Sequence, residues 1–213
     1  MNTPRPDTEQ LEFWRGQFGD DYIDRNAATM STMRSRIAMW ATILGATAGD
    51  PPRQILEVGS NIGNNLRALR SLTDAELFAV EPNDRARSML IDDGIVPVSN
   101  VMDAMAGDIP LADGAVDLAF TSGVLIHIHP DDLLQACSEI HRVSRRLIGC
   151  VEYFAANPET ITYRGNDNKL FKRDFGSFWL DNFPDLRAVD CGFFWNRLTG
   201  LDNLTWWLFE KTG

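Results

Sequence analysis

The stretch Ile55-Leu56-Glu57-Val58-Gly59-Ser60-Asn61-Ile62-Gly63-Asn64-Asn65-Leu66 decides the fold of this chain of 213 residues. Its first four residues are mostly apolar, as in a buried strand, and a glycine turn follows directly. After Gly63, leucines at 66, 69 and 72 have the spacing of one helix face. A strand, a glycine turn and a helix in this order are typical of a doubly wound α/β sheet, where the turn opens onto a ligand crevice.

Strands and helices alternate along the rest of the chain. We expect strands over residues 54–58, 77–81, 95–98, 116–121 and 147–154, and helices over residues 32–47, 64–72, 84–92 and 131–144. Residues 171–183 have a helical pattern, and two final strands follow over 187–195 and 204–210. This order predicts an α/β fold with a Rossmann-like, doubly wound, mostly parallel seven-stranded sheet and an antiparallel C-terminal hairpin strand. We expect residues 1–48 to form an N-terminal helical cap or lid and residues 49–213 to form one compact domain.

The chain is acidic, with 30 Asp and Glu against 20 Lys and Arg and a formal net charge of −10. A nucleic-acid binder needs a basic face to displace counterions from phosphates, and an anionic membrane surface repels acid, so we expect neither partner. No uncharged stretch is long enough to span a bilayer, and the N-terminus shows no apolar signal segment. We therefore expect a cytoplasmic protein, with a homodimer left open as its assembly.

The cysteines and histidines indicate neither a disulfide framework nor a metal site. Cys137, Cys150 and Cys191 are far apart and odd in number, which favours reduced and mostly buried thiols. The three histidines lack the cysteine pairs or the His-Glu-x-x-His spacing of a zinc site. We therefore expect no metal.

The glycine turn excludes two common nucleotide-binding loops. A dinucleotide loop has the pattern Gly-x-Gly-x-x-Gly, but Asn61 and Asn64 stand at its second and third glycines. A Walker loop would need Gly-Lys-Ser/Thr, which does not follow. The remaining pattern, Glu57-x-Gly59-x-x-x-Gly63, resembles the first motif of the class I S-adenosylmethionine-dependent methyltransferases. An acid beside a glycine turn suits a ligand with an ammonium and a sulfonium better than it suits a phosphate.

The resemblance implies a class I methyltransferase domain over residues 49–213, with S-adenosyl-L-methionine as cofactor and S-adenosyl-L-homocysteine as product. In such a domain Glu57 and the turn contact the methionine part of the cofactor, and the turn residues are Gly59, Ser60, Asn61 and Gly63. Ser122 and Gly123 end the fourth strand, which faces the reactive methyl group in this family.

Glu81 is the second expected cofactor contact, because it ends the next strand and is followed by Pro82. It lies 18 residues after Gly63, near the spacing of about 20 used by acids that bind ribose hydroxyls in this topology. An acid there suits a ribose diol and disfavours the 2′-phosphate of NADP. The family's adenine contact is often an Asp, but Met105 stands near that position, so we expect an apolar contact there.

Further stretches carry a narrower resemblance over nearly the whole chain. They are Glu12-Phe13-Trp14-Arg15-Gly16-Gln17-Phe18-Gly19-Asp20-Asp21-Tyr22-Ile23-Asp24-Arg25-Asn26, Gly123-Val124-Leu125-Ile126-His127-Ile128, Glu152-Tyr153, Tyr163-Arg164-Gly165, Lys169-Leu170-Phe171-Lys172-Arg173-Asp174-Phe175 and Leu204-Thr205-Trp206-Trp207. In this order they resemble the small methyltransferases associated with pseudaminic acid biosynthesis. The resemblance implies methylation of a small polar acceptor in small-molecule biosynthesis, including sugar modification.

Basic residues gather between positions 163 and 175. They are Arg164, Lys169, Lys172 and Arg173. Two acids stand against these four cations, so the segment carries a local charge of +2 in an acidic chain. Cations that converge on a cleft would hold a carboxylate or a phosphate, and with Trp14 and Tyr163 they are our candidate substrate-binding residues. We expect an anionic or sugar-like acceptor; the alternative is a solvated helix face with ordinary ion pairs.

Methyl transfer to a sugar hydroxyl needs a general base, whereas an amine or a carboxylate acceptor needs little beyond positioning. His127, just after the fourth strand, is the first candidate base, and Glu152 or Tyr153 on the fifth strand come next. The alternative for His127 is a helix cap or a hydrogen-bonded core histidine.

The N-terminal segment is a candidate lid. Trp14 and Tyr22 would cover the cofactor, and Arg25 or Asn26 would reach its carboxylate; the alternative is a helix docked by its aromatic residues. Two other functions stay open. One is methylation of a peptide or protein carboxylate or amine, and the other is a non-catalytic module that binds S-adenosylmethionine or a nucleotide.

Overall fold

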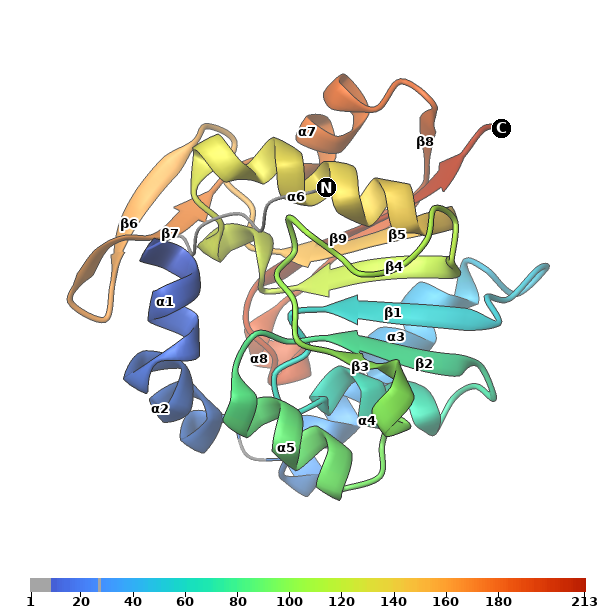
Figure 1. The fold of residues 1–213 in the computed structure, drawn as a ribbon. Helices are drawn as coiled ribbons and strands as arrows, with labels where there is room; N and C mark the ends of the chain where they lie inside the picture. Colours follow the sequence, from blue (N-terminus) through green and yellow to red (C-terminus); the bar gives the residue numbers. More distant parts are fainter. Residues whose placement is uncertain (1–8, 27) are drawn as a thin grey trace, which may run out of the picture.

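The computed structural model describes residues 9–26 and 28–213 and contains a seven-stranded sheet (Figure 1). Its strands are β1 (Gln54–Val58), β2 (Glu76–Val80), β3 (Val101–Met102), β4 (Val116–Ser122), β5 (Ser144–Glu152), β8 (Leu186–Phe194) and β9 (Leu204–Lys211). Their order in the sheet is β3-β2-β1-β4-β5-β9-β8. Strands β1 to β5 run parallel, and β9 is antiparallel to both β5 and β8. The predicted doubly wound sheet with an antiparallel C-terminal hairpin is confirmed.

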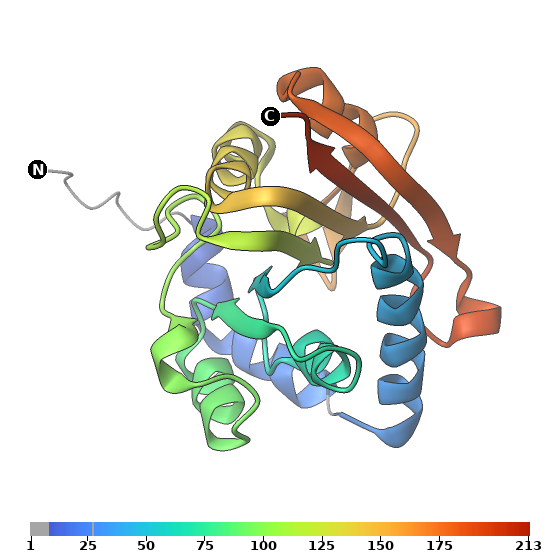
Figure 2. The same ribbon diagram turned by 90° about the vertical axis from the view of Figure 1, so that its right-hand side faces the viewer.

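Helices cover both faces of this sheet (Figure 2). One core contains side chains from α3 (Met30–Gly45), α4 (Asn64–Arg70) and α5 (Asp84–Asp92). The other contains side chains from α6 (Pro130–Val143) and α7 (Phe175–Asn182). The central strands are buried on both faces, and their sequences are therefore nearly continuous apolar runs. Among the described residues, no helix has the length and apolar character that crossing a membrane requires.

Two short helices, α1 (Glu9–Arg15) and α2 (Gln17–Arg25), lie at the carboxyl ends of the parallel strands (Figure 1). We call this pair the cap. Helix α3 is different, because Met39, Trp40 and Ile43 are almost completely buried in the core of the domain. The segment predicted as a cap therefore contains the cap itself and one core helix, and its residues 1–8 and 27 lie outside the described part of the chain.

The strand expected over residues 95–98 is wrong. Pro97 has no N–H to donate to a strand ladder, and the chain makes the 3-10 turn η1 (Val98–Asn100) before it enters β3. The Asn100 side chain holds this turn, since its Nδ2 donates to Leu77 O at 3.2 Å and to Glu76 Oε1 at 3.1 Å. The edge strand therefore begins only at residue 101.

The single helix expected over residues 171–183 is also wrong in its first part. A hairpin of β6 (Glu159–Tyr163) and β7 (Asn166–Lys172) comes first, and α7 begins only after Asp174 caps it. Arg164 and Gly165 form the turn, with φ angles of +52° and +81°. Positive φ at both central residues is typical of the two-residue turns that join strands. The final hairpin, β8 and β9, is joined through the short helix α8 (Asn196–Thr199).

Candidate active site

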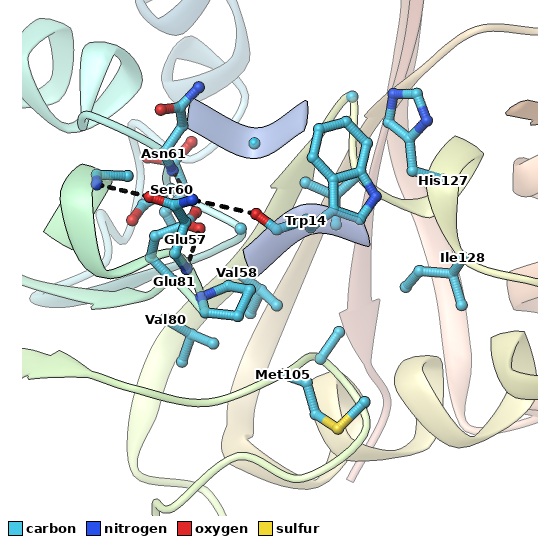
Figure 3. A pocket seen from close by; sticks show the side chains of 18 of the residues that line it. Trp14, Glu57, Val58, Ser60, Asn61, Val80, Glu81, Met105, His127 and Ile128 are labelled. Carbon is cyan, nitrogen blue, oxygen red and sulfur yellow. Dashed lines mark hydrogen bonds between the residues drawn. The ribbon is translucent and has the colours of Figure 1, made fainter. Parts of the chain in front are cut away.

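A cavity lies at the carboxyl ends of β1, β2 and β4, beneath the cap (Figure 3). The strand order changes direction here, because β1 has β2 on one side and β4 on the other. Open α/β sheets bind their ligands at this position. Of the residues predicted to form a site, the lining includes Trp14, Tyr22, Asn26, Glu57, Gly59, Ser60, Asn61, Glu81, Pro82, Met105, Ser122, Gly123 and His127.

The turn after β1 requires glycine at two positions. Gly59 and Gly63 have φ angles of +76° and +77°, which L side chains rarely adopt. A Cβ on Gly59 would lie 2.6 Å from Val124 Cγ2, and one on Gly63 would lie 2.1 Å from Leu90 Cδ1. Gly63 is thus fixed by packing against α5, and it is not part of the cavity lining. Asn61 has a φ of +48°, which asparagine tolerates better than most residues, so no second glycine is needed.

Glu57 is the penultimate residue of β1, and only one of its two buried carboxylate oxygens has a hydrogen-bond partner among the described residues. Its Oε1 accepts a hydrogen bond of 2.6 Å from Asn65 Nδ2, whereas Oε2 is buried without a partner among the described residues. Burial raises the pKa of Glu57 to about 8. A buried acceptor without a donor is costly, so this oxygen is suited to a cationic ligand group.

Arg36 of α3 is a cavity residue that the sequence analysis missed. Its Nη1 donates to Asn65 Oδ1 at 2.8 Å, so Asn65 links Arg36 to Glu57. Its Nε is buried without a partner among the described residues. A free guanidinium N–H and a free carboxylate oxygen, held on one asparagine, match the two charges of an amino-acid zwitterion. The helix register of α3 gave no signal that would single out this arginine.

Other buried polar atoms of the turn also lack partners in the described chain. They are Ser60 Oγ, Asn61 Oδ1 and Asn64 Oδ1. Buried polar groups are normally paired, so several unpaired ones at one cavity wall indicate a site for a polar ligand.

Glu81, at the end of β2, is fixed by two backbone donors. Its Oε2 accepts from Asn61 N at 2.7 Å and its Oε1 accepts from Asn83 N at 2.9 Å. Burial raises the pKa of Glu81, although these two bonds oppose the shift. Each carboxylate oxygen retains a further lone pair, so a diol can still bind. Met105 lines the same cavity beside Ala104 and Ala106, as the predicted apolar contact requires.

His127 ends the 3-10 turn η2 (Leu125–His127) and is buried. Its Nδ1 lies 2.7 Å from Lys169 O, and since a carbonyl only accepts, Nδ1 carries the hydrogen. Nε2 then keeps its lone pair and has no partner among the described residues. Burial lowers the pKa of His127 to about 4, so the ring is neutral at pH 7. The Trp14 and Tyr163 rings flank it, at 4.7 Å and 5.0 Å between centroids.

Glu152 and Tyr153 do not reach this cavity. The carboxylate of Glu152 is fully buried and accepts from the backbone N–H groups of Val124 and Leu125, both at 3.1 Å. It therefore holds the loop that carries His127, which is the physical reason why it is not available as a base. The Tyr153 hydroxyl donates to Asp202 at 2.7 Å in a separate, open groove.

The predicted basic residues do not converge on the cavity. Arg25 stacks over Phe18 and Tyr22, and Arg164 lies over Tyr163 at the hairpin tip. The remaining three are placed as follows: Lys169 contacts the cap, Lys172 lines the groove of Tyr153, and Arg173 lies over Phe178. The strands β6 and β7 separate these side chains, because successive residues of a strand point to opposite faces.

The groove of Tyr153 is lined by a different set of residues from the cavity. Its lining is Tyr153, Phe154, Lys172, Asp174, Phe193, Asp202, Asn203, Thr205 and Trp207. Burial and the hydrogen bond to Asp202 raise the pKa of Tyr153. Of the two other histidines, His129 caps α6 and also lines the cavity, whereas His141 bonds Asp185.

A family described as Methyltransferase domain matches residues 56–146. The matched segment contains the glycine turn and Glu81, and it ends within β5. The comparison with curated proteins finds no match.

Solved structures of methyltransferases share this fold. The Burkholderia thailandensis 1,6-didemethyltoxoflavin-N1-methyltransferase, with its bound acceptor and S-adenosylhomocysteine, is 19% identical, with 99% of this chain and 94% of that chain covered and a TM-score of 0.71. A Leishmania major S-adenosylmethionine-dependent methyltransferase is 16% identical, with coverage of 95% and 87% and a TM-score of 0.72. The Synechocystis magnesium protoporphyrin IX methyltransferase is 10% identical, with coverage of 98% and 100% and a TM-score of 0.66.

The domain match, on a segment that carries the glycine turn and the two acids, decides the class of enzyme. The chain is an S-adenosylmethionine-dependent methyltransferase. The methyltransferase has the donors and acceptors that this cofactor needs: unpartnered atoms of Glu57 and Arg36 for a zwitterion, and the Glu81 carboxylate for a diol. When bound, the cofactor supplies a methyl group that its sulfonium has already activated.

Proposed function

We propose that this methyltransferase transfers a methyl group to an oxygen or a nitrogen of a small polar, sugar-like molecule. The observation that carries the proposal is the buried, neutral His127, which lines the cavity and contacts the Tyr163 ring at 5.0 Å between centroids. In this proposal the acceptor binds beside these two rings and extends into the groove of Tyr153.

The cofactor contacts are part of this proposal. Glu57 and Arg36 hold the ammonium and the carboxylate of the methionine part, and the turn at residues 59–61 covers it. Glu81 holds the ribose, and Met105 lies against the adenine. Tyr22 and Asn26 close the cavity from the cap, since both line it. Several of these groups have buried atoms without protein partners, which supports a ligand of this polarity.

The groove supports a neutral polar acceptor better than an anion. It offers the Tyr153 hydroxyl, Asn203 and Thr205 for hydrogen bonds, and Phe154 and Phe193 are 48% and 58% exposed beside them. Lys172 is its one described cation and faces two acids, Asp174 and Asp202. The Burkholderia relative, which has a small molecule bound with S-adenosylhomocysteine, supports small-molecule methylation as well.

His127 is the base in this proposal. Its Nε2 takes the proton of the acceptor hydroxyl or N–H as the acceptor atom bonds to the methyl group, so one proton moves for each methyl transferred. The neutral ring at pH 7 keeps Nε2 ready to accept. The cap excludes water from the reacting atoms, because Trp14 covers the same ring.

A binding and turnover experiment tests the proposal. Calorimetric titration with S-adenosylhomocysteine should show binding by the wild-type chain, and radioactive methyl transfer should appear with hydroxylated small molecules. His127→Gln should retain binding and lose turnover by about a hundredfold, the scale of general-base catalysis. Transfer to peptides only would support the protein-methylating alternative. Binding without any turnover would support the non-catalytic module, and no binding would overturn the proposal.

The cellular location of the enzyme is also part of the proposal. We expect a cytoplasmic enzyme, since Cys137 and Cys150 are buried free thiols and Cys191 is an exposed one. The narrower link to pseudaminic acid biosynthesis stays a prediction, and so does the homodimer.

A further inference from the structure

Lys169 of β7 is a buried lysine that contacts the cap through its side chain. Only 6% of it is exposed. Its Nζ donates to Gln10 Oε1 at 2.8 Å and lies 4.9 Å from the centroid of the Phe13 ring. Gln10 in turn donates from Nε2 to Asn168 O at 3.0 Å. Helix α1 is therefore attached to β7 at two successive residues.

The backbone of the same lysine fixes His127. The Lys169 carbonyl accepts the Nδ1 hydrogen of His127 at 2.7 Å, and this bond directs the Nε2 lone pair away from β7. Trp14 of α1 packs against the same imidazole, with 4.7 Å between the ring centroids. One residue thus binds the cap with its ammonium and orients the imidazole with its carbonyl.

The cap is also attached at the cofactor end of the cavity. Asn83 follows Glu81, and its Nδ2 donates to Trp14 O at 3.2 Å and to Asp20 Oδ1 at 3.1 Å. Helix α1 therefore connects the loop after β2, where Glu81 lies, with the strand that holds His127. A rigid helix attached at both ends can transmit a change at one end to the other.

We propose that Lys169 is a positioning residue, which couples docking of the cap over the cofactor to the orientation of His127. The inference rests on the proposed function, because it takes the cavity as the cofactor site and His127 as the base. With the cap docked, the Lys169 carbonyl and the Trp14 ring both contact the imidazole. With the cap released, β7 loses its contact with α1 and His127 loses the ring that packs on it.

Two conservative variants test this coupling. Lys169→Met keeps the buried aliphatic stem and the backbone carbonyl but removes the ammonium. Gln10→Leu removes the bond to that ammonium from the cap side, together with the bond to Asn168 O. The ligand in the test is S-adenosylhomocysteine. Its dissociation rate is followed by tryptophan fluorescence, since Trp14 lines the cavity. The tautomer of His127 is read by nitrogen-15 NMR of the histidine-labelled protein in complex with the ligand.

The wild-type complex should show one tautomer, with the hydrogen on Nδ1. Both variants should show a mixture of tautomers and release the ligand about fivefold faster or more, the lower end of typical coupling between sites. The effect of the double variant should be smaller than the sum of the two single effects, because both single variants remove the bond between Lys169 and Gln10. Gln17→Leu is the matched control, since the Gln17 side chain bonds Asp21 within the cap, at 2.7 Å, and no other residue of the described chain.

Two results would overturn the inference. An unchanged His127 tautomer in both variants would show that Lys169 does not orient the ring, even if release were faster. Equal effects of Gln10→Leu and Gln17→Leu would show that any change in the cap acts in the same way. A wild-type chain that does not bind S-adenosylhomocysteine would instead overturn the proposed function, and the coupling with it. Melting temperatures of all variants show whether Lys169→Met folds, and Gln10→Leu keeps the test valid if it does not.

Discussion

At the scale of single residues, burial displaces two pKa values at the cavity in opposite directions. It raises that of Glu57 to about 8 and lowers that of His127 to about 4. In both cases the charged form is the one that burial disfavours. At pH 7 the ligand-free cavity therefore contains a protonated carboxyl group and a neutral imidazole. An ammonium that binds beside Glu57 would favour the ionised form, so binding and proton release are linked.

Glu57 should release about one proton when S-adenosylhomocysteine binds at pH 7, because binding moves its pKa from above to below the solution pH. The proton count is measured by calorimetry in buffers with different ionisation enthalpies. Glu57→Gln should abolish the release and weaken binding by about tenfold or more, the equivalent of a charge-assisted hydrogen bond. An equal proton count in the variant would mean that another group titrates on binding.

Single residues could be predicted where they belong to a sequence motif of fixed spacing. Gly59 and Glu81 stand in a strand–turn–helix unit whose spacing fixes their place at the sheet edge. Arg36 was not predictable, since it reaches the cavity only through the packing of α3 against α4. Glu152 is a carboxylate at the end of a strand, as expected of a base. It is not available because two backbone N–H groups donate to it, and these come from a loop nearly thirty positions earlier in the chain.

At the scale of elements, the cap depends on close contact between α1 and α2. Gly19 lies where they meet, and a Cβ there would stand 1.9 Å from Trp14 O and 2.9 Å from Asn83 Nδ2. The carbonyl oxygen of Trp14 belongs to the backbone of α1, so it cannot move out of the way without displacing that helix. The cap therefore tolerates only glycine at this position.

Gly19→Ala should raise the dissociation constant of S-adenosylhomocysteine by about tenfold, since overpacking of this kind costs about 1–3 kcal/mol and acts on the docked cap. The free energy of unfolding should change less, because the cap lies outside the two main cores. Calorimetry and urea unfolding measure the two effects. Gly45→Ala is the control, since that helical glycine has open space around its Cβ position. A large loss of stability with unchanged binding would contradict a role in the cap.

Elements were predictable where apolar runs marked buried strands, as for β1, β4 and β5. The hairpin of β6 and β7 was not, because many of its residues are exposed and its buried stretch, Lys169 to Phe171, is too short to mark a strand. Its turn at Arg164 and Gly165 was the available signal, but the surrounding cations favoured a helix. These cations then appeared to converge, whereas the strand geometry separates them.

At the scale of the whole molecule, three carboxylates are buried among the described residues: Glu57, Glu81 and Glu152. Burial raises the pKa of all three, to about 8 for Glu57 and to about 7 for Glu152. The net charge of −10 argued against nucleic-acid and membrane partners, but it did not show which carboxylates are buried. Sequence patterns can locate acids at strand ends, but only the packed structure shows how many are cut off from water. The consequence is a dependence of stability on pH that belongs to the molecule as a whole.

The ligand-free protein should lose stability as the pH rises from 6.5 to 8. A carboxyl group with a raised pKa keeps its proton in the folded state and loses it in the unfolded state, so alkali favours unfolding. His127 has a lowered pKa and acts in the opposite direction, but its effect is complete once the pH exceeds 6.5, its unfolded value. Glu57 therefore makes the largest contribution in this interval, with a slope of up to about 1.4 kcal/mol per pH unit that falls to about half of this value as the pH reaches 8. Urea unfolding at several pH values should show the fall in the wild type and a much flatter profile in Glu57→Gln. Parallel profiles for the two proteins would mean that Glu57 is ionised in the folded state, and the proton release on binding would then be absent as well.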